Sequence, residues 1–231
     1  MDVVEPSFEN GMTLLTDEEL SALTDRGHVI RYPPDSILFG EGEETDFALL
    51  LRAGHVKVQV GRPPRTVAVR GPGEIVGEMA PVRRKPRSAS VVAVENVEAL
   101  YIPAITWLRF LYEHPRAMHA QLVAADERLD EATRKSVESY LGVEQRLAKS
   151  LVELAEKGLG KATTRGLEFR FNQRDLASLV GASRESVVQV IRGFKEAGIV
   201  DTGRNITIVM EMKRLKKVAD GESTSSSWKS P

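Results

Sequence analysis

A glycine-rich stretch in the first half of the chain carries the residues best suited to chemistry. It runs Gly73-Glu74-Ile75-Val76-Gly77-Glu78-Met79-Ala80, and Arg87-Ser88-Ala89 begins nine residues after Glu78. A carboxylate accepts hydrogen bonds from sugar hydroxyls, and a guanidinium offers a fork of donors to phosphate oxygens. Backbone N–H groups at the start of a turn after Gly77 would face the same anion. The pattern predicts a site for a ribose phosphate; the plain alternative is a tight turn closed by a Glu78–Arg87 salt bridge.

The two motifs resemble the phosphate-binding cassette of cyclic-nucleotide-binding domains, and residues 14–217 as a whole resemble a bacterial transcription regulator of the CRP/FNR family. In that family the cassette glutamate binds the ribose 2′-hydroxyl, and the arginine and the serine after it bind the cyclic phosphate. These roles match Glu78, Arg87 and Ser88. The resemblance implies no obligatory cofactor, and a cyclic nucleotide, cAMP first, as effector. The ligand-binding residues that it implies are Gly77, Glu78, Met79, Ala80, Arg87, Ser88, Ala89 and Thr133.

A second motif, in residues 172–192, has the spacing of a helix-turn-helix. Asn172 can cap a two-turn helix, Gly181 can supply a left-handed turn, and Ser183 can cap the helix that follows. Small and apolar residues recur on one side of both helices, as the packing of this motif requires. The sequence Val-Gly-Ala-Ser-Arg-Glu-Ser-Val closely resembles the family's DNA-reading motif, and residues 198–209 predict the β-hairpin of a wing.

The second helix of this motif presents side chains suited to base edges. Arg184 can form a fork to guanine, and Glu185 can accept from a cytosine amino group. The alternatives are a phosphate contact for Arg184 and a helix-dipole interaction for Glu185. Gln189, where several relatives have an arginine, favours adenine. Including the expected phosphate contacts, the predicted DNA-binding residues are Asn172, Arg174, Ser183, Arg184, Glu185, Gln189, Arg192 and Lys195.

The periodicity divides the chain into β-rich and helical parts. Short runs rich in β-branched residues, separated by glycine and proline turns, predict a sandwich or small barrel before residue 103. With the resemblance, the predicted class is α+β: an N-terminal β-roll (jelly-roll) domain, a long dimerisation helix and a C-terminal winged helix-turn-helix. The predicted divisions are a flexible arm over 1–13, the β-roll over 14–114, the long helix over 115–142, the winged-helix domain over 143–218 and a disordered, Ser-rich tail over 219–231.

A narrow stripe of apolar and small residues follows the long helix. Its members recur at intervals of three and four, and they are Met118, Leu122, Ala125, Leu129, Ala132 and Ser136. Such a stripe favours a dimer seam, although packing against the chain's own β-domain alone remains the alternative. In the family this helix forms the dimer and also lends polar side chains to the nucleotide base, which by position implies Thr133.

Composition excludes several classes of function. The 231 residues contain no cysteine, so disulfides, thiolate zinc sites and cysteine nucleophiles are excluded. The four histidines have no metal-binding spacing, and Ser88 has no histidine neighbour, so neither a metal site nor an enzyme is predicted. No apolar run is long enough to cross a membrane and the acidic N-terminus does not read as a signal peptide, so a cytoplasmic protein without membrane contact is expected.

Charge is distributed unevenly along the chain. The formal net charge is −1, but residues 1–60 carry 4 Lys and Arg against 12 Asp and Glu, whereas residues 161–217 carry 12 against 6. A positive C-terminal region joined to a negative N-terminal one is typical of a DNA-binding domain fused to a sensing domain.

These patterns predict a ligand-responsive homodimer that binds a pseudo-palindromic operator in double-stranded DNA and acts with RNA polymerase. One alternative is a DNA-binding regulator that needs no ligand or takes another anion, such as a cyclic dinucleotide. Arg83-Arg84-Lys85 adds positive charge beside the cassette, and Pro81 removes one backbone N–H from its turn, although a solvated loop explains the basic run equally simply. Another alternative, a cyclic-nucleotide-dependent module that contacts a protein, is disfavoured by the intact motif at residues 182–187.

Overall fold

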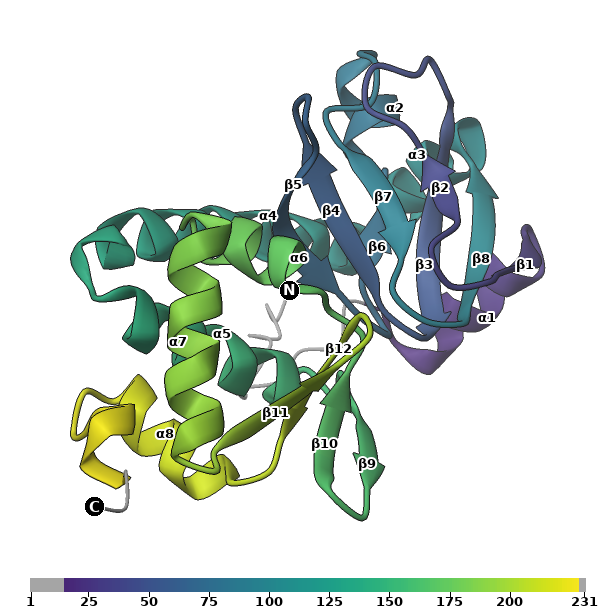
Figure 1. Cartoon of the computed structure of the whole chain (residues 1–231). Helices are drawn as coiled ribbons and strands as arrows, with labels where there is room; N and C mark the ends of the chain where they lie inside the picture. The colour runs from purple at the N-terminus through teal and green to yellow at the C-terminus, as the bar shows by residue number, and fades with distance from the viewer. Residues whose placement is uncertain (1–14, 229–231) are drawn as a thin grey trace, which may run out of the picture.

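Figure 1 shows the computed structural model of the chain, which describes residues 15–228; the predicted arm over residues 1–13 lies outside them. A β-rich N-terminal domain and a mixed C-terminal domain lie side by side, and the chain passes from one to the other through a long helix (Figure 1). The predicted α+β arrangement of a β-domain, a long helix and a C-terminal helix-turn-helix is confirmed.

Two four-stranded antiparallel sheets form the N-terminal domain, with strand orders β1-β8-β3-β6 and β2-β7-β4-β5. Residues of both sheets, among them Leu49, Val56 and Val91, share one buried cluster, so apolar residues of the two sheets meet in the core. Strand β6 was not predicted. The strands are β1 His28–Tyr32, β2 Ile37–Phe39, β3 Phe47–Ala53, β4 Val56–Val60, β5 Arg65–Arg70, β6 Ile75–Val76, β7 Ser90–Ala93 and β8 Val97–Pro103.

Three helices accompany these sheets: α1 Asp17–Thr24, α2 Met79–Arg83 and α3 Ala104–Glu113. The first begins with a capping box, in which the Thr16 hydroxyl accepts from the backbone N–H of Glu19 and the Glu19 carboxylate accepts from that of Thr16. The third packs on the second core cluster of the domain through the fully buried Trp107 and Phe110.

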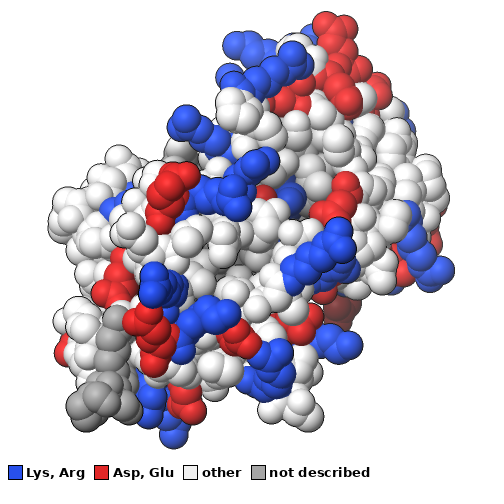
Figure 2. All heavy atoms as spheres, viewed as in Figure 1, with Lys and Arg blue, Asp and Glu red and all other residues white. Residues whose placement is uncertain are grey.

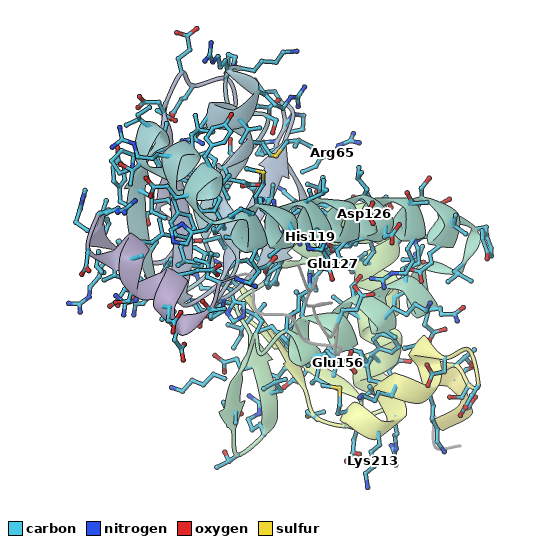
Figure 3. The ribbon with its side chains drawn as sticks, turned by 180° about the vertical axis from the view of Figure 1, so that it is seen from behind. Arg65, His119, Asp126, Glu127, Glu156 and Lys213 are labelled. Carbon is cyan, nitrogen blue, oxygen red and sulfur yellow. The ribbon has the colours of Figure 1, made fainter. Side chains whose placement is uncertain are left out.

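The long helix α4 spans Pro115–Val137, and after a 3-10 turn at Glu138–Tyr140 the chain enters α5, Val143–Glu156. The α-helix therefore ends five residues before the predicted boundary at 142. Beyond this end, the Arg146 guanidinium donates to the backbone carbonyls of Ser139 and Leu141, which satisfies two acceptors that a continued helix would have paired. Seen from behind in Figure 3, α4 passes across the molecule with the labelled His119, Asp126 and Glu127 along it.

The two sides of α4 have different surroundings. Ala117, Ala120 and Gln121 are buried against the N-terminal domain, whereas Leu122 and Leu129 are 68% and 67% exposed. The helix packs on its own domain through its small residues, and its leucines remain at the surface.

The C-terminal domain is a small helical core with a four-stranded sheet of order β11-β12-β10-β9. Its core includes the fully buried Phe169, Phe171 and Phe194. Strand β9 and helix α8 were not predicted. The elements after α5 are β9 Lys161–Thr163, β10 Gly166–Phe169, α6 Gln173–Leu179, α7 Arg184–Glu196, β11 Val200–Gly203, β12 Ile206–Val209 and α8 Met212–Ala219.

The Ser-rich segment after α8 differs from the predicted disordered tail. It continues into a 3-10 turn at Ser225–Trp228, and the backbone N–H of Ser225 donates to Glu144 Oε1 at 2.8 Å. A Cβ added at Gly193, in the middle of α7, would lie 2.9 Å from Ser225 Oγ. The segment therefore packs against α7 where that helix has no side chain; residues 229–231 lie outside the described part of the chain.

The two domains are in direct contact. Val69 and Val94 of the N-terminal domain belong to the buried cluster of the C-terminal domain. Lys57 Nζ on β4 lies 3.3 Å from Asp175 Oδ1 on α6, and both side chains are less than 15% exposed. The C-terminal domain thus docks through α6 onto the β4–β5 hairpin.

Glu131 on α4 joins three elements at this contact. Its carboxylate pairs with Arg70 of β5 at 2.9 Å, with Lys135 at 3.0 Å and with Lys157 at 3.6 Å. Burial acts to raise the pKa of Glu131, but the positive charges of Lys135, Arg70 and Lys157 hold it at about 2. Because the folded-state pKa lies below the unfolded value, the carboxylate stabilises the fold above about pH 4.5, and this stabilisation is lost as the pH falls through 2.

We therefore expect Glu131→Gln to lower the free energy of unfolding by about 2–3 kcal/mol at pH 7 and by progressively less toward pH 3. Urea unfolding of both proteins at several pH values measures this difference. Glu127→Gln, an exposed carboxylate on the same helix, is the matched control and should leave stability nearly unchanged. A Glu131→Gln deficit of the same size at pH 7 and pH 3 would contradict the role given to this carboxylate.

Candidate ligand and nucleic-acid sites

Gly77 directly follows β6, which ends at Val76, and it starts the turn of the cassette. This glycine has φ +79°, in the left-handed region that side chains disfavour, and a Cβ there would lie 2.5 Å from Arg87 Nη1 and 3.0 Å from Phe39 Cε1. Glu78 follows as the N-cap of α2. The glycine thus lets the backbone approach Arg87 closely and directs the chain into a short helix.

Arg87 is only 3% exposed and connects three segments of the N-terminal domain. Its Nε donates to Thr45 Oγ1 at 2.6 Å, Nη2 donates to the Phe47 carbonyl at 2.8 Å, and Nη1 donates to the Gly77 carbonyl. The guanidinium also lies against two rings, 4.2 Å from the centroid of Phe39 and 4.5 Å from that of Phe47. It therefore supports the loops of the cassette as well as supplying charge.

The electrostatic surroundings of Arg87 are acidic. Burial lowers the pKa of the Arg87 guanidinium, and the carboxylates of Glu78, Glu43 and Asp46 act in the opposite direction. An arginine stays charged in proteins, so the cassette holds a buried cation.

Glu78, 2% exposed, pairs with an arginine other than the one the sequence suggested. Arg128 of α4 donates from Nη1 to Glu78 Oε1 at 2.5 Å and from Nη2 to the carbonyl of Ile75 at 2.7 Å. The alternative of a turn closed by a Glu78–Arg87 salt bridge is therefore not what the structure shows. Instead, a contact between α4 and the cassette fixes the orientation of the Glu78 carboxylate.

The other predicted ligand residues lie around this pair, with one exception. Met79 and Ala80 form the first turn of α2, and Ser88 and Ala89 follow Arg87 toward β7, with Ser88 and Met79 exposed. Thr133 is exposed on α4. At 3.6 residues per turn it lies about 140° around the helix from Arg128, so it faces away from its own cassette.

The basic run borders a hollow beside α2 that Ala80 of the cassette also lines. Arg84, in the left-handed conformation with φ +51°, and Lys85 line it together with Glu44, Thr45 and Asp46. The side chains of both signs around this hollow partly cancel each other's attraction for an anion.

The helix-turn-helix carries its caps as predicted. Asn172 Oδ1 accepts from the backbone N–H groups of Arg174 and Asp175 at the start of α6, and Ser183 Oγ accepts from that of Ser186 at the start of α7. Asn172 and Ser183 thus have established structural roles at the two helix starts.

Helix α7 buries one side and exposes the other. Val187, Ile191 and Phe194 are buried in the domain core. The exposed side consists of polar residues and Val188, and its predicted base-reading and phosphate-contacting members are Arg184, Glu185, Gln189 and Arg192. In the structure these four side chains thus lie on one exposed face of a helix whose N-terminus is capped by Ser183.

Some of the predicted phosphate contacts already have ionic partners. Arg192 Nε lies 3.0 Å from Glu196 Oε1, and Lys195 Nζ lies 3.0 Å from Asp201 Oδ1 in the wing. Arg174 is exposed on α6. Figure 2, which has the view of Figure 1, shows positive and negative side chains interspersed over the lower part of the molecule, where the C-terminal domain lies. This view of the domain shows no uniform positive patch.

Comparison with known proteins agrees with this geometry. The family model of the cyclic nucleotide-binding domain matches residues 29–114, and that of the Crp-like helix-turn-helix domain matches residues 145–218. The chain is 32% identical over 194 residues to the Cyclic AMP receptor protein of Thermus thermophilus, covering 82% of this chain and 87% of the relative. The chain belongs to the CRP/FNR family. It is a DNA-binding transcription regulator with a cyclic nucleotide-binding domain, and members of this family are not enzymes.

Other CRP/FNR members align over most of the chain. The CRP-like cAMP-activated global transcriptional regulator of Mycobacterium tuberculosis is 24% identical over 205 residues, covering 87% of this chain and 92% of the relative. The structure of the c-di-GMP responsive global regulator CLP of Xanthomonas campestris matches with a TM-score of 0.71 at 23% identity, covering 84% of this chain and 99% of that one. At this identity the structural match supports the fold alone.

No helix within residues 15–228 is long and apolar enough to cross a membrane. No three His, Asp or Glu side chains within the same range gather closely enough to hold a metal ion.

Sequence reasoning missed Arg128. A usable signal was present: Arg128, Glu131 and Lys135 recur at intervals of three and four on one side of α4, and all three reach polar groups of the β-domain. A stripe of charged residues beside the leucine stripe indicated that one face of α4 contacts the β-domain and a different face carries the leucines.

Proposed function

We propose that the protein is a homodimeric transcription regulator whose binding to operator DNA is gated by a cyclic nucleotide, cAMP, held in the β-roll. The observation that carries the proposal is the pair of buried, oppositely charged groups in the cassette, Glu78 and Arg87. Arg128 contacts one oxygen of the Glu78 carboxylate, so the other oxygen can accept a ribose hydroxyl.

The donor count of Arg87 fits a phosphate. A guanidinium has five N–H donors, and the three bonds to Thr45, Gly77 and Phe47 use one donor on each nitrogen. One N–H therefore remains on Nη1 and one on Nη2, which is the pair that forms a fork to two phosphate oxygens. Ser88 and the N-terminal backbone of α2 would complete the phosphate contacts.

A cyclic dinucleotide, or DNA binding without ligand, is the second candidate. It is favoured by the exposed Arg83-Arg84-Lys85 run beside the cassette. Against it, Glu44 and Asp46 share the hollow beside that run. The more similar Thermus relative is named a Cyclic AMP receptor protein, which favours cAMP.

The exposed leucines of α4 support a dimer. Leu122 and Leu129 lie seven residues apart on the surface of the helix, as in the seam of a two-helix coiled coil. In such a dimer Thr133, which faces away from its own cassette, would approach the ligand of the partner subunit. The paired recognition helices would then meet successive major grooves about 34 Å apart, and the complex would act with RNA polymerase in the cytoplasm.

Calorimetric titration of the full chain with cAMP, cGMP and cyclic di-GMP tests the effector. We expect saturable cAMP binding and a cAMP-dependent gel shift on genomic fragments. Binding of cyclic di-GMP alone would support the second candidate, and a gel shift unaffected by any nucleotide would support ligand-independent DNA binding. Nucleotide binding without any gel shift would contradict the proposed output.

DNA affinity should also fall steeply with salt. With about six phosphate contacts per dimer, displaced counterions give a slope near −5 in a plot of log association constant against log salt. Fluorescence anisotropy of labelled operator DNA between about 50 and 200 mM salt measures this slope. A flat response would show that the basic C-terminal region does not contact DNA phosphates.

A further inference from the structure

His55 lies at the contact between the two domains. It follows Gly54 in the turn between β3 and β4, and it is 5% exposed. Its Nδ1 is 2.7 Å from Glu95 Oε1, in the turn between β7 and β8, and its Nε2 is 3.0 Å from the backbone carbonyl of Lys157 at the end of α5. One imidazole ring therefore connects the sensing domain to the DNA-binding domain.

Both partners of this ring accept hydrogen bonds. A carboxylate and a backbone carbonyl carry no proton to donate, and a neutral imidazole carries a single N–H. Only the imidazolium form donates to Glu95 and Lys157 at the same time. In the neutral form one ring nitrogen presents a lone pair to an oxygen, so one of the two bonds is lost.

The His55 ring packs closely against Gly71. A Cβ added at Gly71 would lie 2.8 Å from His55 Cδ2 and 2.9 Å from Nε2, so the ring fills the space that this glycine leaves open. At 5% exposure, solvent has little access to replace a lost bond, and an unmade bond at a buried polar group is costly.

The other charged groups at this contact already have partners. The Lys157 ammonium lies near Glu131, Arg70 pairs with Glu131 and Glu74, and Lys57 pairs with Asp175 across the two domains. In ordinary surroundings Lys, Arg, Asp and Glu do not change charge between about pH 5 and 8, whereas histidine does. Among these groups, His55 is therefore the one whose number of N–H donors depends on its protonation state.

We propose that His55 is a pH-responsive bridge that holds the DNA-binding domain docked on the sensing domain when protonated and loosens it when neutral. Docking that requires the imidazolium takes up a proton, so by linkage it is stronger at low pH and weakens as the pH rises. The exposed residues of α7, such as Arg184 and Gln189, remain accessible in the docked arrangement. The bridge thus affects the orientation of the recognition helix and does not cover it. A change in pH would then act on the protein independently of the ligand.

Intramolecular energy transfer tests docking without ligand or DNA, so its outcome is independent of the proposed effector and of operator binding. The chain has no cysteine, and Glu18→Cys on α1 together with Lys213→Cys on α8, both at exposed positions, supply dye sites on the two domains; Figure 3 shows Lys213 at the far end of the C-terminal domain. Labelled chain is diluted into excess unlabelled chain, so that any dimer carries one labelled copy.

Between pH 5.5 and 8 we expect the ratio of docked to undocked molecules to fall about fivefold to tenfold, the equivalent of one hydrogen bond. His55→Gln, which cannot donate from both ends of its amide, should remove this pH response. Glu95→Gln is the second variant, in case His55→Gln folds poorly. It keeps the histidine but replaces the carboxylate, and it should reduce the pH response. His28→Gln, which removes an exposed histidine of β1, should leave it unchanged. A wild-type ratio that does not vary with pH, or an unaltered response in both His55→Gln and Glu95→Gln, would overturn the proposal.

Discussion

Replacing Arg87 by alanine should weaken cyclic nucleotide binding by about 30-fold to several-thousand-fold. The change removes the buried guanidinium whose remaining donors fit the phosphate, and losing such a charged partner costs on the order of 2–5 kcal/mol. Arg87→Lys should lose a good part of the same affinity, because an ammonium cannot form the bidentate fork. Calorimetric titration of the two variants and the wild type with cAMP measures both effects.

The structure adds a second expected effect of the same substitution. Since Arg87 also holds Thr45, Phe47 and Gly77 together, Arg87→Ala should lower the free energy of unfolding by a further few kcal/mol, about 1–1.5 for each lost bond. Binding must therefore be measured under conditions where circular dichroism shows the variant folded. Thr45→Val, which removes one of these bonds but keeps the charge, should lower stability by about 1 kcal/mol while leaving most of the affinity intact.

Arg84→Ala is the control for charge near the site. Arg84 lines the hollow beside α2. Within residues 15–228, the side-chain hydrogen bonds to the Gly77 carbonyl and the Glu78 carboxylate come from Arg87 and Arg128, not from Arg84. We expect its variant to bind cAMP nearly as the wild type does. If Arg84→Ala abolishes binding while Arg87→Ala retains it, the basic run is the anion site, and the cAMP proposal fails.

The cassette could be located from sequence because its chemistry is local. Gly77, Glu78 and Arg87 lie within eleven residues of one another, so their residue types could be recognised as one motif. In the structure Gly77 has a left-handed conformation and lies directly beside the Arg87 guanidinium. The partner of Glu78 could not be located in the same way. Arg128 lies 50 residues away, and its contact depends on how α4 packs on the β-domain, which residue spacing within the cassette does not encode.

The same distinction holds for the fold. Asn172 and Ser183 could be assigned as caps because a cap is recognised from its immediate neighbours. The two-residue strand β6 exists because Ile75 and Val76 pair with β3, a contact with residues 49 and 50 that periodicity over so short a run cannot show. The segment around Ser225 has a disordered composition but packs on Gly193 and Glu144, so a tertiary contact outweighs the local signal.

The double variant Leu122→Glu, Leu129→Glu should abolish dimerisation. Each leucine is about two-thirds exposed in the single chain. Burying this exposed part in a dimer interface contributes roughly 1–2 kcal/mol per side chain. The four leucines of a dimer therefore account for roughly 4–8 kcal/mol of association, and four facing carboxylates add repulsion. Multi-angle light scattering should give a monomer mass for the variant and a dimer mass for the wild type.

Loss of the dimer should also remove most of the affinity for an operator with two half-sites, since a monomer places only one recognition helix on the DNA. Ile37→Glu is the matched control, because Ile37 on β2 is 64% exposed but lies away from α4 on an edge strand. It should remain a dimer and keep its DNA affinity. A dimer mass for the leucine variant would show that the seam lies elsewhere, and α4 would then pack only on its own β-domain.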